Sequence, residues 1–242
     1  MKAVAIGIHG DDLEGGIGGI LYMLHKKGWE TKILIVSPNN LSDDIEKTNE
    51  QSIYAASILG AEKTIFDYNA TKYFKCNEET IEKTNEFIVK ENPDVLFILH
   101  PQDHHIEHKE VSKAAREAVF RAAVDGVCPN EIYSVELGPM QTMCYFNPDI
   151  YIDITSVFDV VKDSLYAFNQ SHADGEGLVK EKEICAAFRG HTMGFSIKYA
   201  EALKIIKYPD KNNDFLLKEA LNDNFRWAGT KMYYPFDEIL MI

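Results

Sequence analysis

Two short segments of the sequence concentrate side chains that bind metal ions and transfer protons. The first is His9-Gly10-Asp11-Asp12, which directly follows an apolar run. The second spans residues 100–108 and contains four of the chain's eight histidines. A catalytic zinc ion takes three nitrogen or oxygen ligands from the protein and leaves a fourth position open for water. Together the two segments hold enough donors of the right type for such a site.

The spacing inside each segment suits a shared ion. His9 and Asp12 are three positions apart in a predicted turn and can converge on one cation. His105 and His108 are also three positions apart, at the start of a predicted helix, where positions i and i+3 share a face. One of these two histidines would complete the ligand set, and the other would face the open position. Asp11 would remain free to take a proton from the bound water.

Each segment also has a purely structural interpretation. A histidine after a strand is often a polar loop residue, and consecutive aspartates such as Asp11 and Asp12 often cap a helix. However, both segments follow predicted strands, and ligands of open α/β sheets bind beyond the carboxyl ends of the strands. Two complementary segments in that position favour a functional site over coincidence.

The elements that must position these segments alternate along the first hundred residues. Apolar runs predict buried strands, and apolar residues at helical spacing between them predict amphipathic helices. Strands that alternate with helices imply right-handed crossovers. We therefore predict an α/β fold with a Rossmann-like, doubly wound, mostly parallel sheet and helices on both faces. The predicted strands are Ala3–Ile8, Thr31–Val36, Thr64–Phe66 and Val95–Leu99.

Beyond residue 100 the pattern predicts a long helix, a strand-rich segment, two further helices and a polar, weakly patterned tail. No low-complexity linker divides the chain, so we predict one domain over residues 1–242. The walls of a substrate pocket are expected from residues 131–200. The predicted ranges are Glu107–Val124 for the long helix, 131–154 for the strand-rich segment, Ser156–Gln170 and Leu178–Phe188 for the two helices, and the residues after Tyr208 for the tail.

Composition and charge narrow the partners and the compartment. The formal net charge is −13 and we find no basic patch, so nucleic acid and anionic membrane surfaces are poor partners. The apolar stretches are shorter than the roughly 20 residues of a spanning helix, and no targeting signature is recognised. The four cysteines form no C-x-x-C pair, which favours reduced thiols. We expect a cytoplasmic protein. The cysteines are Cys76, Cys128, Cys144 and Cys185.

The two metal-binding segments resemble the motifs of the PIG-L/LmbE-like zinc-dependent N-deacetylases. The family's H-P-D-D-x-E motif and the glycine-rich stretch after it are similar to residues 9–19. Its P-x-D-x-H-x-D-H motif is similar to residues 101–108. Weaker similarities, among them Tyr199-Ala200-Glu201-Ala202, extend the resemblance over roughly residues 3–203. Two positions depart from the family pattern. Gly10 stands in place of a proline and Glu107 in place of an aspartate, and neither is an expected ligand.

The resemblance implies a role for each polar residue of the two segments. His9, Asp12 and His108 would hold Zn²⁺ or another divalent metal. Asp11 would be the general base, and His105 would face the substrate and stabilise the oxyanion. Three further residues are candidates for supporting or substrate-binding roles. Asp103 would orient a histidine ring or cap a helix, Glu14 would support its helix or reach the site, and His100 would support the site or simply end a strand.

The resemblance implies a metal-dependent hydrolase that removes an N-acyl group, with acetyl favoured, from a sugar or sugar-like small molecule, and a homo-oligomer. Three alternatives stay open. An amidase on a non-sugar acyl amine or thiol conjugate would use the same site. A metal- or sugar-binding protein without turnover is disfavoured because such a protein needs no free Asp11. A nucleotide-binding oxidoreductase is disfavoured because the G-G-x-G-G stretch has the wrong spacing for a dinucleotide loop.

Overall fold

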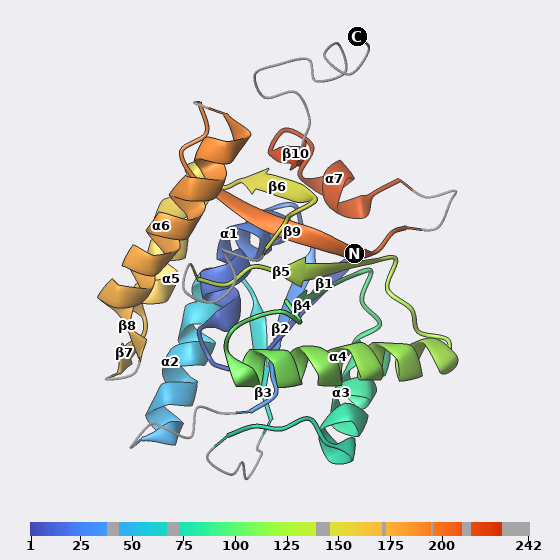
Figure 1. The fold of residues 1–242 in the computed structure, drawn as a ribbon. Helices are drawn as coiled ribbons and strands as arrows, with labels where there is room; N and C mark the ends of the chain where they lie inside the picture. Colours follow the sequence, from blue (N-terminus) through green and yellow to red (C-terminus); the bar gives the residue numbers. More distant parts are fainter. Residues whose placement is uncertain are drawn as a thin grey trace.

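The computed structural model describes residues 1–37, 44–66, 73–138, 146–170, 173–194, 196–209 and 214–228 and shows an eight-stranded sheet between two layers of helices (Figure 1). Five neighbouring strands are parallel in the order β3-β2-β1-β4-β5, which confirms the predicted doubly wound, mostly parallel sheet. These strands are β1 (Lys2–Gly7), β2 (Glu30–Ile35), β3 (Glu62–Ile65), β4 (Val95–Leu99) and β5 (Glu131–Val135).

An antiparallel extension continues the sheet past β5 in the order β9-β6-β10. Its strands are β9 (Ala200–Lys207), β6 (Ile150–Asp153) and β10 (Phe225–Trp227), and β6 confirms the strand-rich segment. The sequence pattern did not predict β9, and the segment after Tyr208, in which the weak pattern predicted no element, contains both β10 and the short helix α7 (Leu216–Ala220). The pattern failed to predict β9 because the buried Glu201 interrupts the apolar run that marks a buried strand.

The helices divide between the two faces of the sheet (Figure 1). One face carries α1 (Asp12–Lys26), α2 (Ile45–Ile58), α5 (Phe158–Tyr166) and α6 (Gly175–Met193), and the other carries α3 (Glu78–Glu91) and α4 (Ile106–Val124). None of the helices in these described ranges combines the length and the apolar character that spanning a bilayer requires.

Two predicted helix boundaries after residue 150 were wrong. A 3-10 turn (Thr155–Val157) precedes α5, which ends at Tyr166. The buried ring of Phe168 packs against Ala55, and the next two residues pair as β7 (Asn169–Gln170) with β8 (Ala173–Asp174). By contrast, α6 extends beyond the predicted range at both ends. It begins earlier because Asp174 caps it by accepting a hydrogen bond from the backbone of Glu176 (3.2 Å). Both boundaries depend on tertiary contacts or caps rather than on apolar spacing.

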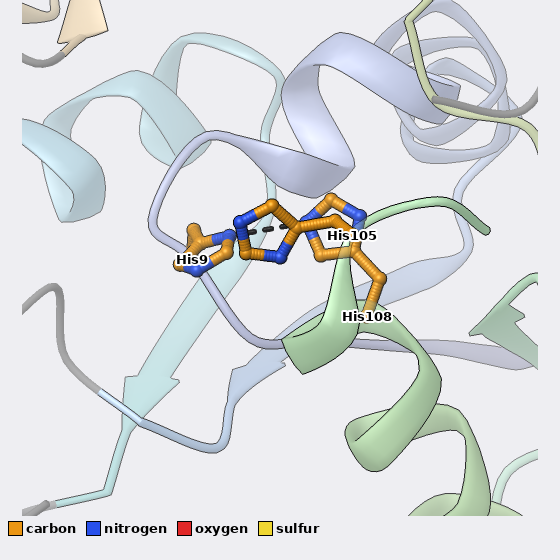
Figure 2. Close-up of side chains that lie close together, drawn as sticks. All are labelled: His9, His105 and His108. Carbon is orange, nitrogen blue, oxygen red and sulfur yellow. Dashed lines mark hydrogen bonds between the residues drawn. The ribbon is translucent and has the colours of Figure 1, made fainter. Parts of the chain in front are cut away.

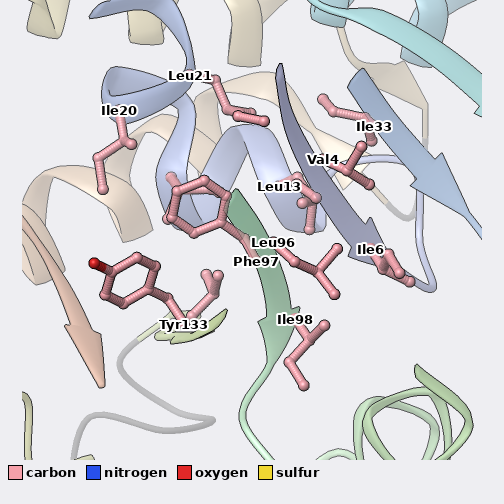
Figure 3. Close-up of a cluster of buried hydrophobic side chains, with 14 of the residues drawn as sticks. Val4, Ile6, Leu13, Ile20, Leu21, Ile33, Leu96, Phe97, Ile98 and Tyr133 are labelled. Atoms are coloured by element: carbon pink, nitrogen blue, oxygen red, sulfur yellow. The ribbon is translucent and has the colours of Figure 1, made fainter. Parts of the chain in front are cut away.

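The core extends over both faces of the sheet, and one part of it lies between the parallel strands and α1. Residues 3–7 of β1 and all of β4 are buried, and Leu13, Ile20 and Leu21 of α1 pack onto them (Figure 3). Each fully buried side chain of this kind stabilises the fold by about 1.5–3 kcal/mol relative to an exposed one. The core therefore holds rigid the two strands that end at the candidate site. Cys76, Cys128 and Cys185 are free thiols, and Cys144 lies outside the described residues.

Glycines allow α1 to lie close to the sheet. A Cβ atom at Gly16 would lie 2.6 Å from Val135 Cγ1, and one at Gly19 would lie 2.6 Å from Ile154 Cγ2. Both distances are too short for real atoms, so a side chain at either position would push the helix outward. This confirms that the glycine-rich stretch serves helix packing rather than a dinucleotide loop.

Candidate active site

The two candidate segments meet at the switch point of the sheet. β1 lies between β2 and β4, and the helices that follow β1 and β4 leave toward opposite faces. The loops after these two strands therefore diverge and leave a crevice at their carboxyl ends, which is where open α/β sheets bind ligands. Residues 8–11 form the loop after β1, and residues 100–105 form the loop after β4.

Three donor atoms converge in this crevice. His9 Nδ1 lies 3.1 Å from His108 Nε2, His108 Nε2 lies 3.3 Å from Asp12 Oδ1, and His9 Nδ1 lies 3.5 Å from Asp12 Oδ1. Zinc ligands at about 2.0–2.1 Å in a tetrahedral arrangement are separated from one another by about 3.3 Å. The structure thus brings together the three residues expected to hold the metal, at the spacing such an ion requires.

Hydrogen bonds set the direction of each donor. Asp12 Oδ2 accepts from the backbone of Ile8 and of His9, at 2.9 Å each, which turns Oδ1 toward the histidines. His108 Nδ1 lies 2.9 Å from Asp103 Oδ2. A carboxylate only accepts, so Nδ1 carries the hydrogen and Nε2 presents its lone pair to the crevice. Asp103 also accepts from the backbone N–H of His105 (2.7 Å), so it combines the ring-orienting and the helix-capping roles that the sequence left open.

Glu107 performs the same task for His9. Its Oε2 lies 3.1 Å from His9 Nε2, and its Oε1 accepts from the backbone of Phe74 at 2.7 Å. His9 Nε2 therefore donates to Glu107, and the lone pair of Nδ1 faces His108 and Asp12. The sequence analysis missed this contact, although the carboxylate next to His108 was a visible signal. The longer glutamate arm, which stands where the family has aspartate, reaches His9 without displacing it.

The electrostatics of the three donors favour a positive charge between them. Burial disfavours the charged imidazolium, but Asp12 and Glu107 raise the pKa of His9 well above its usual range. In the same way, Asp12 and Asp103 overcome burial and raise the pKa of His108 to about 9. Burial would raise the pKa of Asp12, but the facing His108 and His9 lower it well below its usual range. Three lone pairs that face one another need a cation, either protons or a metal ion.

His105 lies beside the three donors. Its ring centroid is 5.0 Å from that of His9 and 4.5 Å from that of His108 (Figure 2). Nitrogen atoms of the three histidines lie within 4.8 Å of one another. Among the described residues, the buried Nδ1 of His105 has no hydrogen-bond partner. Burial and the neighbouring His108 and His9 lower the pKa of His105. The ring is thus placed to contact a ligand at the crevice rather than to support another side chain.

Asp11 lines an open cleft. The walls of the cleft come from residues 11–16, 136–138, 178–186 and 200–202, so the later half of the chain supplies most of them, as expected. Burial and the adjacent Asp12 carboxylate raise the pKa of Asp11. Asp11 therefore lies between the donor set and the cleft without belonging to the donor set.

Glu14 holds the first motif in place instead of reaching the donors. Its Oε1 lies 2.5 Å from Lys63 Nζ, and both side chains are fully buried. Lys63 also donates to the Gly10 carbonyl (2.7 Å) and to Ser52 Oγ (2.8 Å), and Ser52 donates to the same carbonyl (2.8 Å). The structure thus constrains the Gly10 turn with two side-chain donors in place of the family's proline. The sequence did not reveal Lys63 or Ser52, since neither lies in a motif.

His100 stays outside the donor set. Its Nδ1 lies 2.9 Å from Ser134 Oγ, and its ring meets Phe146 edge to face at 5.0 Å. Its carbonyl accepts from the backbone of Asp103 at 3.2 Å, which makes it a strand-end residue that helps to place Asp103.

The buried Glu14–Lys63 pair leads to a prediction about stability. Lys63→Met is expected to lower the free energy of unfolding by about 3–5 kcal/mol, because it leaves Glu14 buried without its counter-ion. Urea titration followed by circular dichroism measures this change. Lys83→Met is the matched control, because it removes a lysine from an exposed pair with Glu79 (2.8 Å) and should cost no more than about 1 kcal/mol. Equally small losses in both variants would contradict the assigned role of Lys63.

Comparison with known proteins gives a sequence relationship and a fold relationship. A protein of Escherichia coli (strain K12), named as an uncharacterized deacetylase, YaiS, is 30% identical over 122 residues, which span 48% of this chain and 66% of that protein. The fold is similar to that of GalB, the 4-carboxy-2-hydroxymuconate hydratase of Pseudomonas putida KT2440, with a TM-score of 0.71, 20% identity, and coverage of 88% of this chain and 99% of that one. It is also similar to that of N,N'-diacetylchitobiose deacetylase from Pyrococcus horikoshii, with a TM-score of 0.68, 18% identity, and coverage of 87% and 88%.

At these identities the structural likeness shows the fold alone. One similar structure is a hydratase and the other a deacetylase, so the fold does not select the reaction. The sequence relationship is more specific. Residues 4–119 match the family model PIG-L, described as GlcNAc-PI de-N-acetylase, and this range contains both segments that supply the converging donors. Over these residues the chain is therefore similar to the PIG-L de-N-acetylases.

Proposed function

We propose that this protein is a zinc-dependent N-deacetylase that acts on an N-acetylated sugar or a sugar-like small molecule. The observation that carries the proposal is the convergence of His9, Asp12 and His108 at 3.1–3.5 Å beside the cleft that Asp11 lines. The match to the PIG-L family model supports a deacetylase, and the donor set supports the metal. Nitrogen and oxygen donors also accept other divalent metals, so the bound ion must be identified by experiment.

The residues fit a divalent cation for two reasons. The donor atoms have the spacing of tetrahedral ligands, and Asp103 and Glu107 hold the two rings with their lone pairs toward one point. A cation held there would polarise an amide carbonyl and make a water molecule acidic enough to attack it near neutral pH.

The chain's own residues supply the proton transfers. The Asp11 carboxylate lies at the cleft and takes a proton from the attacking water, then returns it to the departing nitrogen. His105, whose buried Nδ1 has no hydrogen-bond partner in the described part of the chain, contacts the carbonyl oxygen and stabilises the charge that develops on it.

The sugar substrate rests on the family description, which names an N-acetylated sugar, GlcNAc. The carboxylates of Asp11 and Glu181 lie on the walls of the cleft, which suits a substrate rich in hydroxyl groups. An acyl amine without a sugar would use the same donor set. Only a substrate comparison separates the two.

A substrate screen tests the proposal. Purified protein is incubated with N-acetylglucosamine, N,N'-diacetylchitobiose and N-acetylated amines without a sugar, with or without a chelator, and free amine is measured with an amine-reactive fluorophore. We expect amine release from the sugars, loss of release with chelator, and recovery after zinc is restored. Release only from the non-sugar amines would reassign the substrate class. Release that persists in chelator would contradict the metal mechanism, and absence of release from every amide would contradict the deacetylase.

A further inference from the structure

The helix that begins at Asp12 is interrupted one turn later. Ile17 has φ −134° and ψ 26°, outside the helical range, within the otherwise continuous α1. Sharp changes in a helix usually have an identifiable cause, such as a proline or a side chain inserted into the hydrogen-bond ladder. The sequence of α1 contains no proline, but Gly15-Gly16 and Gly18-Gly19 flank Ile17 and leave the backbone free to depart from the helix.

A buried ion pair occupies the interruption. In a regular α-helix the backbone N–H groups of residues 19 and 20 donate to carbonyls four positions earlier. Here Gly19 donates to Glu201 Oε1 (2.9 Å) and Ile20 donates to Glu201 Oε2 (2.8 Å). Lys182 Nζ donates to the Gly16 carbonyl (3.1 Å) and to Glu201 Oε1 (2.7 Å). The carboxylate thus caps the second part of α1 and the ammonium group caps the first part.

Stability alone is a weak explanation for this pair. The exposed fractions of the Lys182 and Glu201 side chains are 4% and 1%, so both charges lose almost all of their hydration. A buried ion pair of this kind often contributes no more stability than apolar residues of the same size. Such a pair instead holds the backbone groups that it contacts in one geometry.

The pair connects three elements at one point. Glu201 comes from β9 and Lys182 from α6, and both contact α1 at the end of the turn that begins with Asp12. That turn carries Asp12 toward His9 and His108, and Asp11 directly precedes it. We infer that the Lys182–Glu201 pair is a positioning device that sets the direction of the first turn of α1, and thereby the places of Asp11 and Asp12 relative to the two histidines. Its effect on metal binding rests on the metal site of the proposed function, and its effect on turnover rests on the proposed reaction as well.

Glu201→Gln tests this inference, because glutamine keeps the shape but loses one acceptor oxygen and the charge. Glu131→Gln is the matched control. Glu131 is also fully buried and accepts from two consecutive backbone N–H groups, those of Leu216 and Leu217, and from the Tyr133 hydroxyl. It lies at the first residue of β5, at the opposite end of that strand from the candidate site. Both variants lose a buried charge and a helix cap, but only Glu201 accepts hydrogen bonds from α1.

We expect both variants to show a lower Tm, and only Glu201→Gln to bind zinc more weakly and to turn over more slowly. The expected changes are about 10–100-fold in the zinc Kd, measured by competition with a chromogenic chelator, and about 10–100-fold in kcat, with a smaller change in KM. If Glu201→Gln does not fold, the double variant Lys182→Gln/Glu201→Gln removes both charges and is measured in the same way.

An unchanged zinc Kd in the folded variant, with a Tm loss equal to that of Glu131→Gln, would reduce the pair to a structural role and overturn the inference. A change confined to KM would also overturn it, because it would make the pair a substrate contact at the cleft. A wild-type protein that binds zinc but releases no amine from any probe would contradict the proposed function. In that case the zinc Kd of the variants still decides the inference.

Discussion

Asp11→Asn is expected to reduce kcat for N-acetyl amide hydrolysis by about 10²–10⁴-fold while the protein keeps its zinc. The reason is the separation of tasks in the site. Asp11 faces the cleft and is absent from the His9–Asp12–His108 donor contacts, so its loss removes proton transfer and leaves the ligands intact. Asparagine has nearly the same shape but cannot take a proton from water. Steady-state kinetics on the best substrate of the screen measures kcat, and elemental analysis measures zinc.

The control for Asp11→Asn is the same substitution at a residue far from the site. Asp125→Asn makes the same chemical change at the exposed residue after α4 and should leave kcat and zinc content unchanged. If Asp11→Asn retained kcat within a few-fold of the wild type, a different group would have to be the base. If instead it lost its zinc together with its activity, Asp11 would be a ligand, and the assignment of the donor set would be wrong.

His108→Ala is expected to abolish zinc binding and, with it, detectable activity. His108 Nε2 lies 3.1 Å from His9 Nδ1 and 3.3 Å from Asp12 Oδ1, so it belongs to two of the three donor contacts. Its removal leaves only two protein donors, fewer than the three that catalytic zinc sites use. It also leaves the buried carboxylates of Asp12 and Asp103 without the ring that they both contact.

Two measurements check the His108 prediction. Elemental analysis should find zinc in the wild type and none in the variant. Zinc at about 100 times its Kd should stabilise the wild type by about 2.7 kcal/mol, seen as a rise in Tm, and should leave the Tm of the variant unchanged. His104→Ala is the matched control, since His104 is an exposed histidine of the same segment and has no place in the donor set. Equal zinc contents in wild type and His108→Ala would refute the site.

The parallel half of the fold could be predicted because its signals are local. The apolar runs of β1 and β4 are buried on both faces, and the polar segments directly after them had to meet where the two strands lie side by side. The antiparallel half was less predictable. β9 contains the buried Glu201, whose partners are backbone groups of α1, so its pattern resembled neither a buried strand nor an alternating one.

The sequence by itself determined the donor types, their grouping into two segments and the edge of the sheet where they meet. Only the tertiary structure decided what supports them. Glu107 reaches His9 across 98 positions, Lys63 reaches the Gly10 carbonyl across 53, and Glu201 reaches Gly19 across 182. Local patterns record the spacing of neighbours along the chain, whereas a hydrogen bond depends on distance in space. Local spacing therefore does not reveal which group such a residue holds, even where the residue lies in a motif, as Glu107 and Glu201 do.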